Sequence, residues 1–248
     1  MWPRFLNVGD TAVTVEFGDG VDPALLARVD ALDLAVRAAM ASGRLPGVVE
    51  TVPTFRSLTV VYDPLLTSRA EIDPVLPSEV SGAVAVASRN ARHWRLPVCY
   101  GNEFGPDLEG MASSVGVSPE EIVRLHASTV YRVYMLGFLP GFPFMGDLPE
   151  MLALPRRQEP RVRVPAGSVA TAGRLTAIYP WESPGGWHLL GRCPVPLFSP
   201  HWPGAALFLP GDCVGFYAID AAEFMHIERR WQGSGEVPVE YLVPAEAA

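Results

Sequence analysis

The sequence predicts an α+β protein with a small ferredoxin-like domain over residues 1–88 and a β-barrel or closed sandwich over residues 89–248. Strand and helix patterns alternate in the first part, whereas short strands separated by Gly and Pro turns fill most of the second. Glycine (23) and proline (25) are frequent among the 248 residues, yet hydrophobic residues reach 49%. This mixture favours a folded, β-rich protein with many shaped turns over a disordered chain.

The first domain is predicted from six consecutive elements. Residues 11–17 alternate as a half-buried strand, and Asp22 with Pro23 supplies the cap and first turn of a helix that ends near Gly43. Residues 48–52 and 57–62 read as paired strands, 68–76 as a helix interrupted by proline, and 83–87 as a last strand. The resulting β-α-β-β-α-β order is the ferredoxin-like pattern.

The second domain begins with a strand at residues 95–100 and two helices, at 107–115 and 118–128. The second of these helices has a capping box, Ser118 with Glu121, and Pro119 at its first position. Short strands then follow one another at residues 130–138, 162–164, 168–172, 176–179, 187–191, 195–198 and 213–219. A late helix at 221–231 and an edge strand at 237–243 complete a barrel or closed sandwich.

All 19 basic side chains are arginine, because the chain contains no lysine. This excludes a Walker-type phosphate lysine, a Schiff base and a biotin attachment site in this chain. The net charge of −8 disfavours nucleic acid and anionic membranes as partners. Since no apolar run approaches the ~20 residues of a membrane span and no signal peptide is evident, we expect a cytoplasmic protein.

Several familiar site types are missing from the sequence. Cys99, Cys193 and Cys213 form no CxxC pair, and the five histidines show no ligand spacing, so no metal site is predicted. The segment around Ser168 is not a GxSxG nucleophile elbow. A hydrolytic triad that used Ser168 would have no local signature.

Positive charge is concentrated in residues 156–192, where six arginines face only two glutamates for a net charge of +4. Such a segment suits a small carboxylate or phosphate ligand held by guanidinium groups, although single arginines can instead pair with acidic side chains elsewhere. The turn at residues 183–187, Ser-Pro-Gly-Gly-Trp, can present consecutive free N–H groups as an anion-binding nest.

The stretch from Gly137 to Gly146 contains three phenylalanines, two prolines and three glycines, which excludes a regular helix or central strand. It predicts a rigid apolar loop that lines a pocket, presents a partner surface or packs on its own core. His126, at the end of a helix, is either a structural residue stabilised by the helix dipole or an acid or base in the pocket.

These same residues resemble the family of 5-oxoprolinase B subunits, KipI-like proteins and allophanate hydrolase subunit 1 proteins. The resemblance covers nearly the whole chain and rests on His126 and on four stretches: the run 134–146 ending GFLPGFPFMG, PRR at 155–157, PRVRVPAGSV at 160–169, and residues 178–192. It implies a small N-terminal α/β domain followed by a cyclophilin-like β-barrel.

The resemblance also implies a function. Such proteins look like one component of an ATP-dependent 5-oxoprolinase, an amidohydrolase that opens the lactam of 5-oxo-L-proline to L-glutamate. The implied partners are a KipA-like C subunit and a LamB/YcsF-like A subunit, and the implied cofactor is ATP with Mg²⁺ bound by the complex. A lactam is a poor electrophile, so the site must hold a carboxylate and a phosphoryl group with donors placed where charge develops.

We therefore expect three groups of site residues in this sequence. The expected catalytic residues are His126, Tyr179 and Arg163. The expected substrate- or phosphate-binding residues are Arg161, Arg192, Ser168, Thr176, Ser183, Gly185 and Gly186. The expected pocket or partner loop contains Phe138, Pro140, Gly141 and Phe142.

Two alternative functions stay open at the level of the sequence. A KipI-like inhibitor of a sensor histidine kinase would use the 138–145 loop as its docking surface. A carboxyltransferase-like subunit of a urea carboxylase or allophanate hydrolase system would need a biotinylated partner, because this chain has no lysine to carry biotin.

Overall fold

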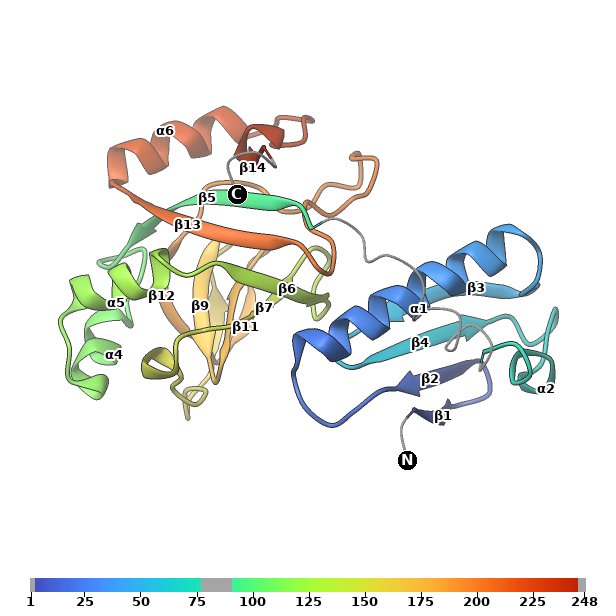
Figure 1. The fold of residues 1–248 in the computed structure, drawn as a ribbon. Coiled ribbons are helices and arrows are strands. Elements are labelled where there is room, and N and C mark those ends of the chain that lie inside the picture. The colour runs from blue at the N-terminus through green and yellow to red at the C-terminus, as the bar shows by residue number, and fades with distance from the viewer. Residues whose placement is uncertain (1–2, 77–90, 245–248) are drawn as a thin grey trace. The chain divides into compact units, whose positions relative to one another are not determined.

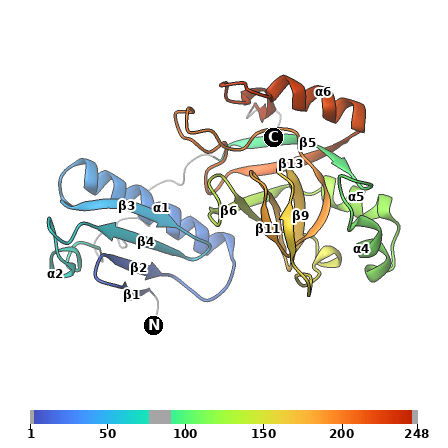
Figure 2. The same ribbon diagram turned by 180° about the vertical axis from the view of Figure 1, so that it is seen from behind.

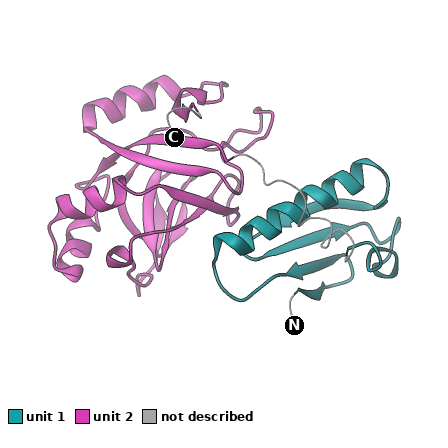
Figure 3. Cartoon of the chain, in the orientation of Figure 1, with its two compact units in different colours: residues 1–90 teal, residues 91–248 magenta. Residues whose placement is uncertain are grey.

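The computed structural model describes residues 3–76 and 91–244. The chain divides into two compact units, residues 1–90 and 91–248 (Figure 3). Among the described helices, none combines the length and apolar character that crossing a membrane requires.

The N-terminal unit is a four-stranded antiparallel sheet with one long helix (Figure 1). Its elements are β1 (Arg4–Val8), β2 (Ala12–Glu16), α1 (Pro23–Ala41), β3 (Val48–Pro53), β4 (Ser57–Tyr62) and α2 (Arg69–Ile72). The Asp22 side chain caps α1 by accepting the N–H of Ala24, as the Asp-Pro pair predicts. Buried aliphatic residues of α1, such as Val29, Leu32 and Val36, pack with the sheet residues Val13, Val15 and Leu58.

The order of strands in this sheet is β1-β2-β4-β3, and its edge strand β1 is not among the predicted elements. The strand β1 was not expected, and it occupies the position beside β2 through a hairpin whose turn includes Gly9 with a left-handed φ of 56°. The predicted last strand at 83–87 lies outside the described residues. The helix expected over 68–76 is reduced to α2, and the ferredoxin-like assignment therefore stays a prediction.

The C-terminal unit is a closed barrel of seven strands (Figures 1 and 2). The barrel strands are β5 (His93–Tyr100), β6 (Tyr131–Leu136), β7 (Pro143–Gly146), β9 (Ser168–Ala172), β10 (Leu175–Ile178), β12 (His188–Arg192) and β13 (Cys213–Ile219). Pairing of β12 with β5 closes the order β12-β9-β10-β7-β6-β13-β5, and closure leaves no free edge in the ring. Among the barrel strands that the structure describes, only β13 and β5 pair in parallel.

Shorter elements surround this barrel. The strands β8 (Arg161–Val164) and β11 (Ser183–Gly185) form a separate antiparallel pair, and β14 (Leu242–Val243) adds to β5. The helices are α4 (Leu108–Val115), α5 (Pro119–Ala127) and α6 (Ala221–Trp231), with short 3₁₀ turns η1 (Glu150–Leu152) and η2 (Val239–Tyr241). The helix α4 contacts α5, and α6 contacts β5.

The strand predictions fail mainly near prolines. The segment predicted at 195–198 is a loop with a single bridge, Phe198 to Ala206, because Pro194 and Pro196 lack the N–H that a ladder needs. Conversely, Pro143 begins the unexpected strand β7, since the first residue of a strand tolerates proline. The segment predicted at 237–243 is mostly η2, followed by the two residues of β14.

Candidate functional site

An aromatic pocket of about 320 Å³ lies on the barrel unit beside β11. Five aromatic side chains line it, together with one arginine and a set of prolines and glycines: Phe138, Phe142, Phe144, Tyr179, Trp187, Arg156, Pro160, Pro184, Gly185 and Gly186. The pocket therefore joins the predicted apolar loop, Tyr179 and the Gly-Gly segment, which are far apart in the sequence.

The apolar loop connects β6 to β7 and is held by its own backbone. The Gly137 N–H donates to the Phe142 carbonyl at 3.1 Å, and the Phe142 N–H donates to the Leu139 carbonyl at 3.0 Å. Gly141 has a φ of +77°, and a Cβ there would lie 2.7 Å from the Cβ of Phe198, so glycine is required. The loop is thus a fixed wall of the pocket.

The loop divides its phenylalanines between core and surface. Phe142 is buried and meets Tyr179 edge to face at 5.0 Å, whereas Phe138 is 64% exposed. Pro140 is exposed, and its carbonyl accepts a hydrogen bond from the Trp181 indole at 3.2 Å. Phe138 lines the pocket and Trp181 is bonded to the same loop, so this loop region exposes two large aromatic side chains.

Arg156 supplies the positive charge of the aromatic pocket. Its guanidinium lies over the Trp187 ring at 5.9 Å, and it makes no ion pair with the residues that the structure describes. Burial raises the pKa of Tyr179, and the nearby charge of Arg156 offsets this only in part. The Tyr179 hydroxyl is consequently protonated at neutral pH and can donate a hydrogen bond.

Gly185 and Gly186 form the floor of the pocket, but not as the predicted nest. Residues Ser183–Gly185 are the strand β11, paired with β8, and neither glycine has a left-handed φ. Backbone pairing uses groups that a free turn would have offered to an anion. A Cβ on Gly185 would lie 2.4 Å from the Tyr179 hydroxyl oxygen, so this glycine allows Tyr179 to approach the backbone.

Arg157 and Arg161 are paired with a buried carboxylate, Asp107. Asp107 accepts hydrogen bonds from Arg157 at 2.7 Å, from Arg161 at 2.7 and 2.8 Å, and from the Leu189 N–H at 2.7 Å. Burial raises the pKa of Asp107, but the hydrogen bonds from Arg161 and Leu189 and the two guanidinium charges together lower it below the usual 3.8. Arg161 thus holds the fold together beside the pocket instead of facing it.

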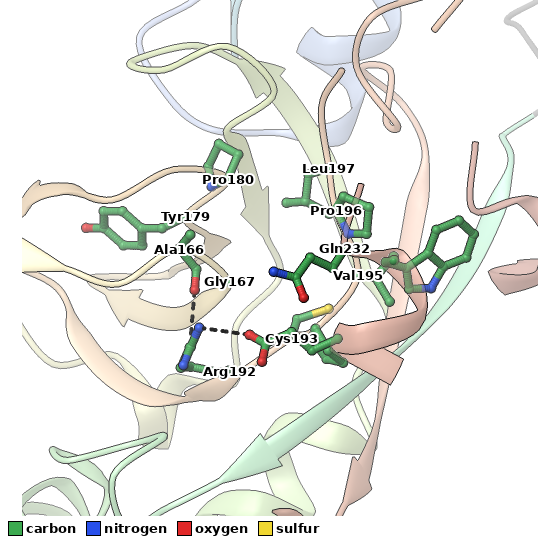
Figure 4. A pocket seen from close by; sticks show the side chains of 13 residues that line it. Ala166, Gly167, Tyr179, Pro180, Arg192, Cys193, Val195, Pro196, Leu197 and Gln232 are labelled. Atoms are coloured by element: carbon green, nitrogen blue, oxygen red, sulfur yellow. Dashed lines mark hydrogen bonds and ion pairs between the residues drawn. The ribbon is translucent and has the colours of Figure 1, made fainter. Parts of the chain in front are cut away.

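Arg163 and Arg192 also have acidic partners. Arg163 is 76% exposed, forms a bidentate pair with Glu182, and is not among the residues that line the aromatic pocket. Arg192 lies 3.5 Å from Glu228 in a second pocket, which we name the Arg192 pocket (Figure 4). The aromatic pocket and the Arg192 pocket share only Tyr179 among the residues that line them.

His126 and Thr176 lie in the closed core, and both are completely buried. Thr176 donates to the Ala170 carbonyl, so its oxygen accepts from His126 Nε2–H at 3.0 Å, and Nδ1 then accepts from the Tyr100 hydroxyl at 2.9 Å. The ring also stacks on Phe216 at 5.0 Å. Burial lowers the pKa of His126 to about 3, so the ring is neutral. Both ring nitrogens are hydrogen-bonded, which indicates a structural role.

The two predicted serines also face inward. Ser168 is 1% exposed, and its hydroxyl has no hydrogen-bond partner in the described part of the chain. Ser183 is 8% exposed, and its hydroxyl donates to the Pro184 carbonyl at 3.3 Å. Neither hydroxyl is part of the lining of a described pocket.

The structure brings together Phe138, Phe142, Tyr179, Gly185 and Gly186 from the predicted set. It adds Arg156, Trp187 and Phe144, which sequence reasoning left out of the site although Arg156 belongs to the basic segment. The sequence does not show which arginine of this segment is available for a ligand. In the structure, the neighbouring arginines Arg157, Arg161 and Arg163 have carboxylate partners, and Arg156 has none among the described residues. Chemically, the pocket can bind a flat apolar ring that carries a carboxylate, with a phenol as hydrogen-bond donor.

Nucleotide binding finds little support in these residues. Across residues 3–76 and 91–244, no three His, Cys, Asp or Glu side chains are grouped so that they could hold a metal ion. The first three residues of the predicted nest form the paired strand β11, and the lysine that phosphate loops use is absent from the sequence. The described residues therefore do not fit a site for ATP with Mg²⁺ within this chain.

The chain matches a known protein family and is similar to a protein of known name. The family model for the carboxyltransferase domain, subdomain C and D, matches residues 3–208. The chain is similar to the B subunit of 5-oxoprolinase from Bacillus subtilis (strain 168), with 38% identity over 233 residues, 88% of this chain and 93% of that protein.

The fold of this chain is also similar to those of solved structures. TTHA0988 has a TM-score of 0.71 and 39% identity, covering 85% of this chain and 40% of that one, so the present chain spans well under half of TTHA0988. The urea amidolyase of K. lactis has a TM-score of 0.73 at 20% identity, covering 91% of this chain and 15% of that one. At that identity the likeness shows the fold alone.

Proposed function

Because the chain belongs to the family of carboxyltransferase-domain proteins, subdomains C and D, and within it to the 5-oxoprolinase B subunits, we propose that it is one component of an ATP-dependent 5-oxoprolinase. The complex would open the lactam of 5-oxo-L-proline to L-glutamate. The part of this chain would be to recognise the lactam in the aromatic pocket.

The observation that carries this assignment is Arg156, which lies over Trp187 and has no ion pair within residues 3–76 and 91–244. Its neighbours Arg157 and Arg161 share an ion pair with Asp107, and Arg163 is paired with Glu182. Arg156 is thus the guanidinium in this pocket that is available for a ligand carboxylate. The compact ring of 5-oxoproline would pack against Phe142 and Trp187 while its carboxylate binds Arg156.

Tyr179 would orient the lactam. Its hydroxyl stays protonated because burial raises its pKa, and Gly185 leaves space for it. A donor placed at the lactam carbonyl oxygen would polarise a bond that resonance otherwise protects from attack. His126 has no part in this proposal, since none of its surface is exposed.

The partners would supply the rest of the reaction. We assign ATP and Mg²⁺ to a KipA-like C subunit and a LamB/YcsF-like A subunit, since the described residues of this chain do not fit them. The exposed Phe138 and Trp181 beside the pocket support a site that a partner completes. In TTHA0988 the similar region is part of a much longer chain, which is consistent with a function that needs further domains.

The test is reconstitution with candidate C and A subunits and an assay of ADP release that depends on 5-oxo-L-proline. Arg156→Gln should raise the KM for 5-oxo-L-proline at least about tenfold. Arg174→Gln is the matched control, because Arg174 is exposed, lies outside both pockets and makes no ion pair with described residues. Equal kinetics in both variants would refute the role of Arg156, and activity on urea or allophanate alone would refute the substrate.

A further inference from the structure

The Arg192 pocket, of about 460 Å³, lies where the ends of β9 and β12 meet the last turn of α6. Three contacts fix the Arg192 side chain there: Nε donates to the Ala166 carbonyl at 3.2 Å, the guanidinium lies over the Phe224 ring at 5.2 Å, and Nη2 lies 3.5 Å from Glu228 Oε1. Figure 4 shows the first and third of these contacts as dashed lines. The cation is therefore positioned by the protein before any ligand arrives.

Arg192 and Glu228 are only loosely paired. A distance of 3.5 Å is at the outer limit for a hydrogen bond, and the Glu228 side chain is 51% exposed. Arg192 Nη1 and Glu228 Oε2 have no partner among the described residues. One cation and one anion, both with bonding capacity left, thus lie side by side in one pocket.

Apolar side chains form part of the walls around this pair. Val195 and Leu197 of the proline-rich loop and the Trp231 indole line the pocket, and the Gln232 side chain extends into it from the end of α6 (Figure 4). Lining of this kind holds a small organic molecule and orients it through a few polar groups. An anion alone would meet the unfavourable charge of Glu228, and a cation alone would meet that of Arg192.

We propose that the Arg192 pocket binds a free α-amino acid as its zwitterion, with the α-carboxylate on Arg192 and the α-ammonium on Glu228. In an α-amino acid the two charges are attached to one carbon, so they match two neighbouring side chains of opposite sign. The apolar walls and Gln232 receive the side chain of the ligand. In the aromatic pocket, by contrast, Arg156 makes no ion pair with the described residues and no acidic residue lines the pocket, which suits a simple carboxylate.

One consequence rests on the proposed function. Lactam opening turns the ring nitrogen of 5-oxo-L-proline into the α-ammonium of L-glutamate, so the substrate is an anion without ammonium and the product is a zwitterion. The Arg192 pocket would then distinguish the product from the substrate, because only the product carries an α-ammonium group for Glu228.

Calorimetric titration of the purified 248-residue chain tests the proposal, with L-glutamate as the probe. N-acetyl-L-glutamate is the matched ligand, because acetylation keeps both carboxylates and removes the ammonium charge. We expect saturable binding of L-glutamate, binding of N-acetyl-L-glutamate that is about tenfold weaker or worse, and a similar loss in Glu228→Gln and in Arg192→Gln. Arg174→Gln, at an exposed arginine outside the lining of both pockets, should bind L-glutamate as the wild type does.

Absence of saturable L-glutamate binding would overturn the proposal. So would equal binding of the acetylated ligand, or binding that neither Glu228→Gln nor Arg192→Gln weakens. Because the titration needs neither a partner protein nor turnover, it can fail while 5-oxoprolinase activity is present, or succeed while that activity is absent. Unchanged thermal unfolding of both variants excludes misfolding as the cause of lost binding.

Discussion

Protonation of His126 provides a sharp test of the barrel core. Burial lowers the pKa of this ring from the usual 6.5 to about 3, so below pH 6.5 the unfolded chain binds a proton that the folded protein does not. Stability is therefore lost as the pH falls from about 6.5 towards 3. The full difference of pKa corresponds to about 5 kcal/mol, of which about 2.5 kcal/mol is lost between pH 7 and pH 4.5.

Urea unfolding followed by tryptophan fluorescence measures this loss, because Trp94, Trp181, Trp187, Trp202 and Trp231 all lie in the barrel unit. The control is His126→Gln, which keeps hydrogen-bonding groups but does not titrate. Between about pH 7 and about pH 4.5 the wild type should lose about 2.5 kcal/mol more than this variant. An equal loss in both proteins would show that His126 is not a buried neutral ring.

Three further predictions follow from the geometry. Asp107→Asn removes the charge that partners two guanidinium groups, so the free energy of unfolding at neutral pH should fall by about 2–4 kcal/mol in the same urea assay, and an unchanged value would contradict the role of the cluster. Gly185→Ala places a Cβ 2.4 Å from the Tyr179 hydroxyl oxygen and should lower kcat/KM of the reconstituted complex at least about tenfold, whereas Gly110→Ala, in the open on α4, should leave turnover unchanged. The Cys193 thiol is buried and its pKa is raised to about 12, so a thiol reagent at neutral pH should modify it only after unfolding, and rapid labelling of the native protein would refute this.

Elements whose ends have local chemical signals were predictable from the sequence. Asp22 with Pro23 begins α1, and Ser118 with Pro119 begins α5, where the Ser118 hydroxyl accepts the Glu121 N–H as its spacing predicts. These contacts join residues two or three positions apart, so the sequence shows both partners. The strand β7 and the pairing of β11 with β8 depend on distant neighbours, and they were missed.

Of the candidate site, the sequence located the segments but not the orientation of their side chains. The apolar loop, Tyr179 and the Gly-Gly segment do meet in one pocket. His126, by contrast, is turned into the barrel because the helix α5 packs on β13, and Thr176 on β10 is completely buried beside it. Their residue types are compatible with catalysis, and only burial and the bonded partners distinguish the structural role.

By itself, the sequence determined that anions must be held by arginine or backbone N–H groups, because it contains no lysine, and that arginines concentrate in residues 156–192. The tertiary structure decided which of them are available. Arg157 meets Asp107 from 50 positions away, whereas Arg156, its immediate neighbour, lies over Trp187 in a pocket without a carboxylate partner. The physical reason is that the interaction of two charges depends on their separation in space and on the dielectric between them, and folding sets both.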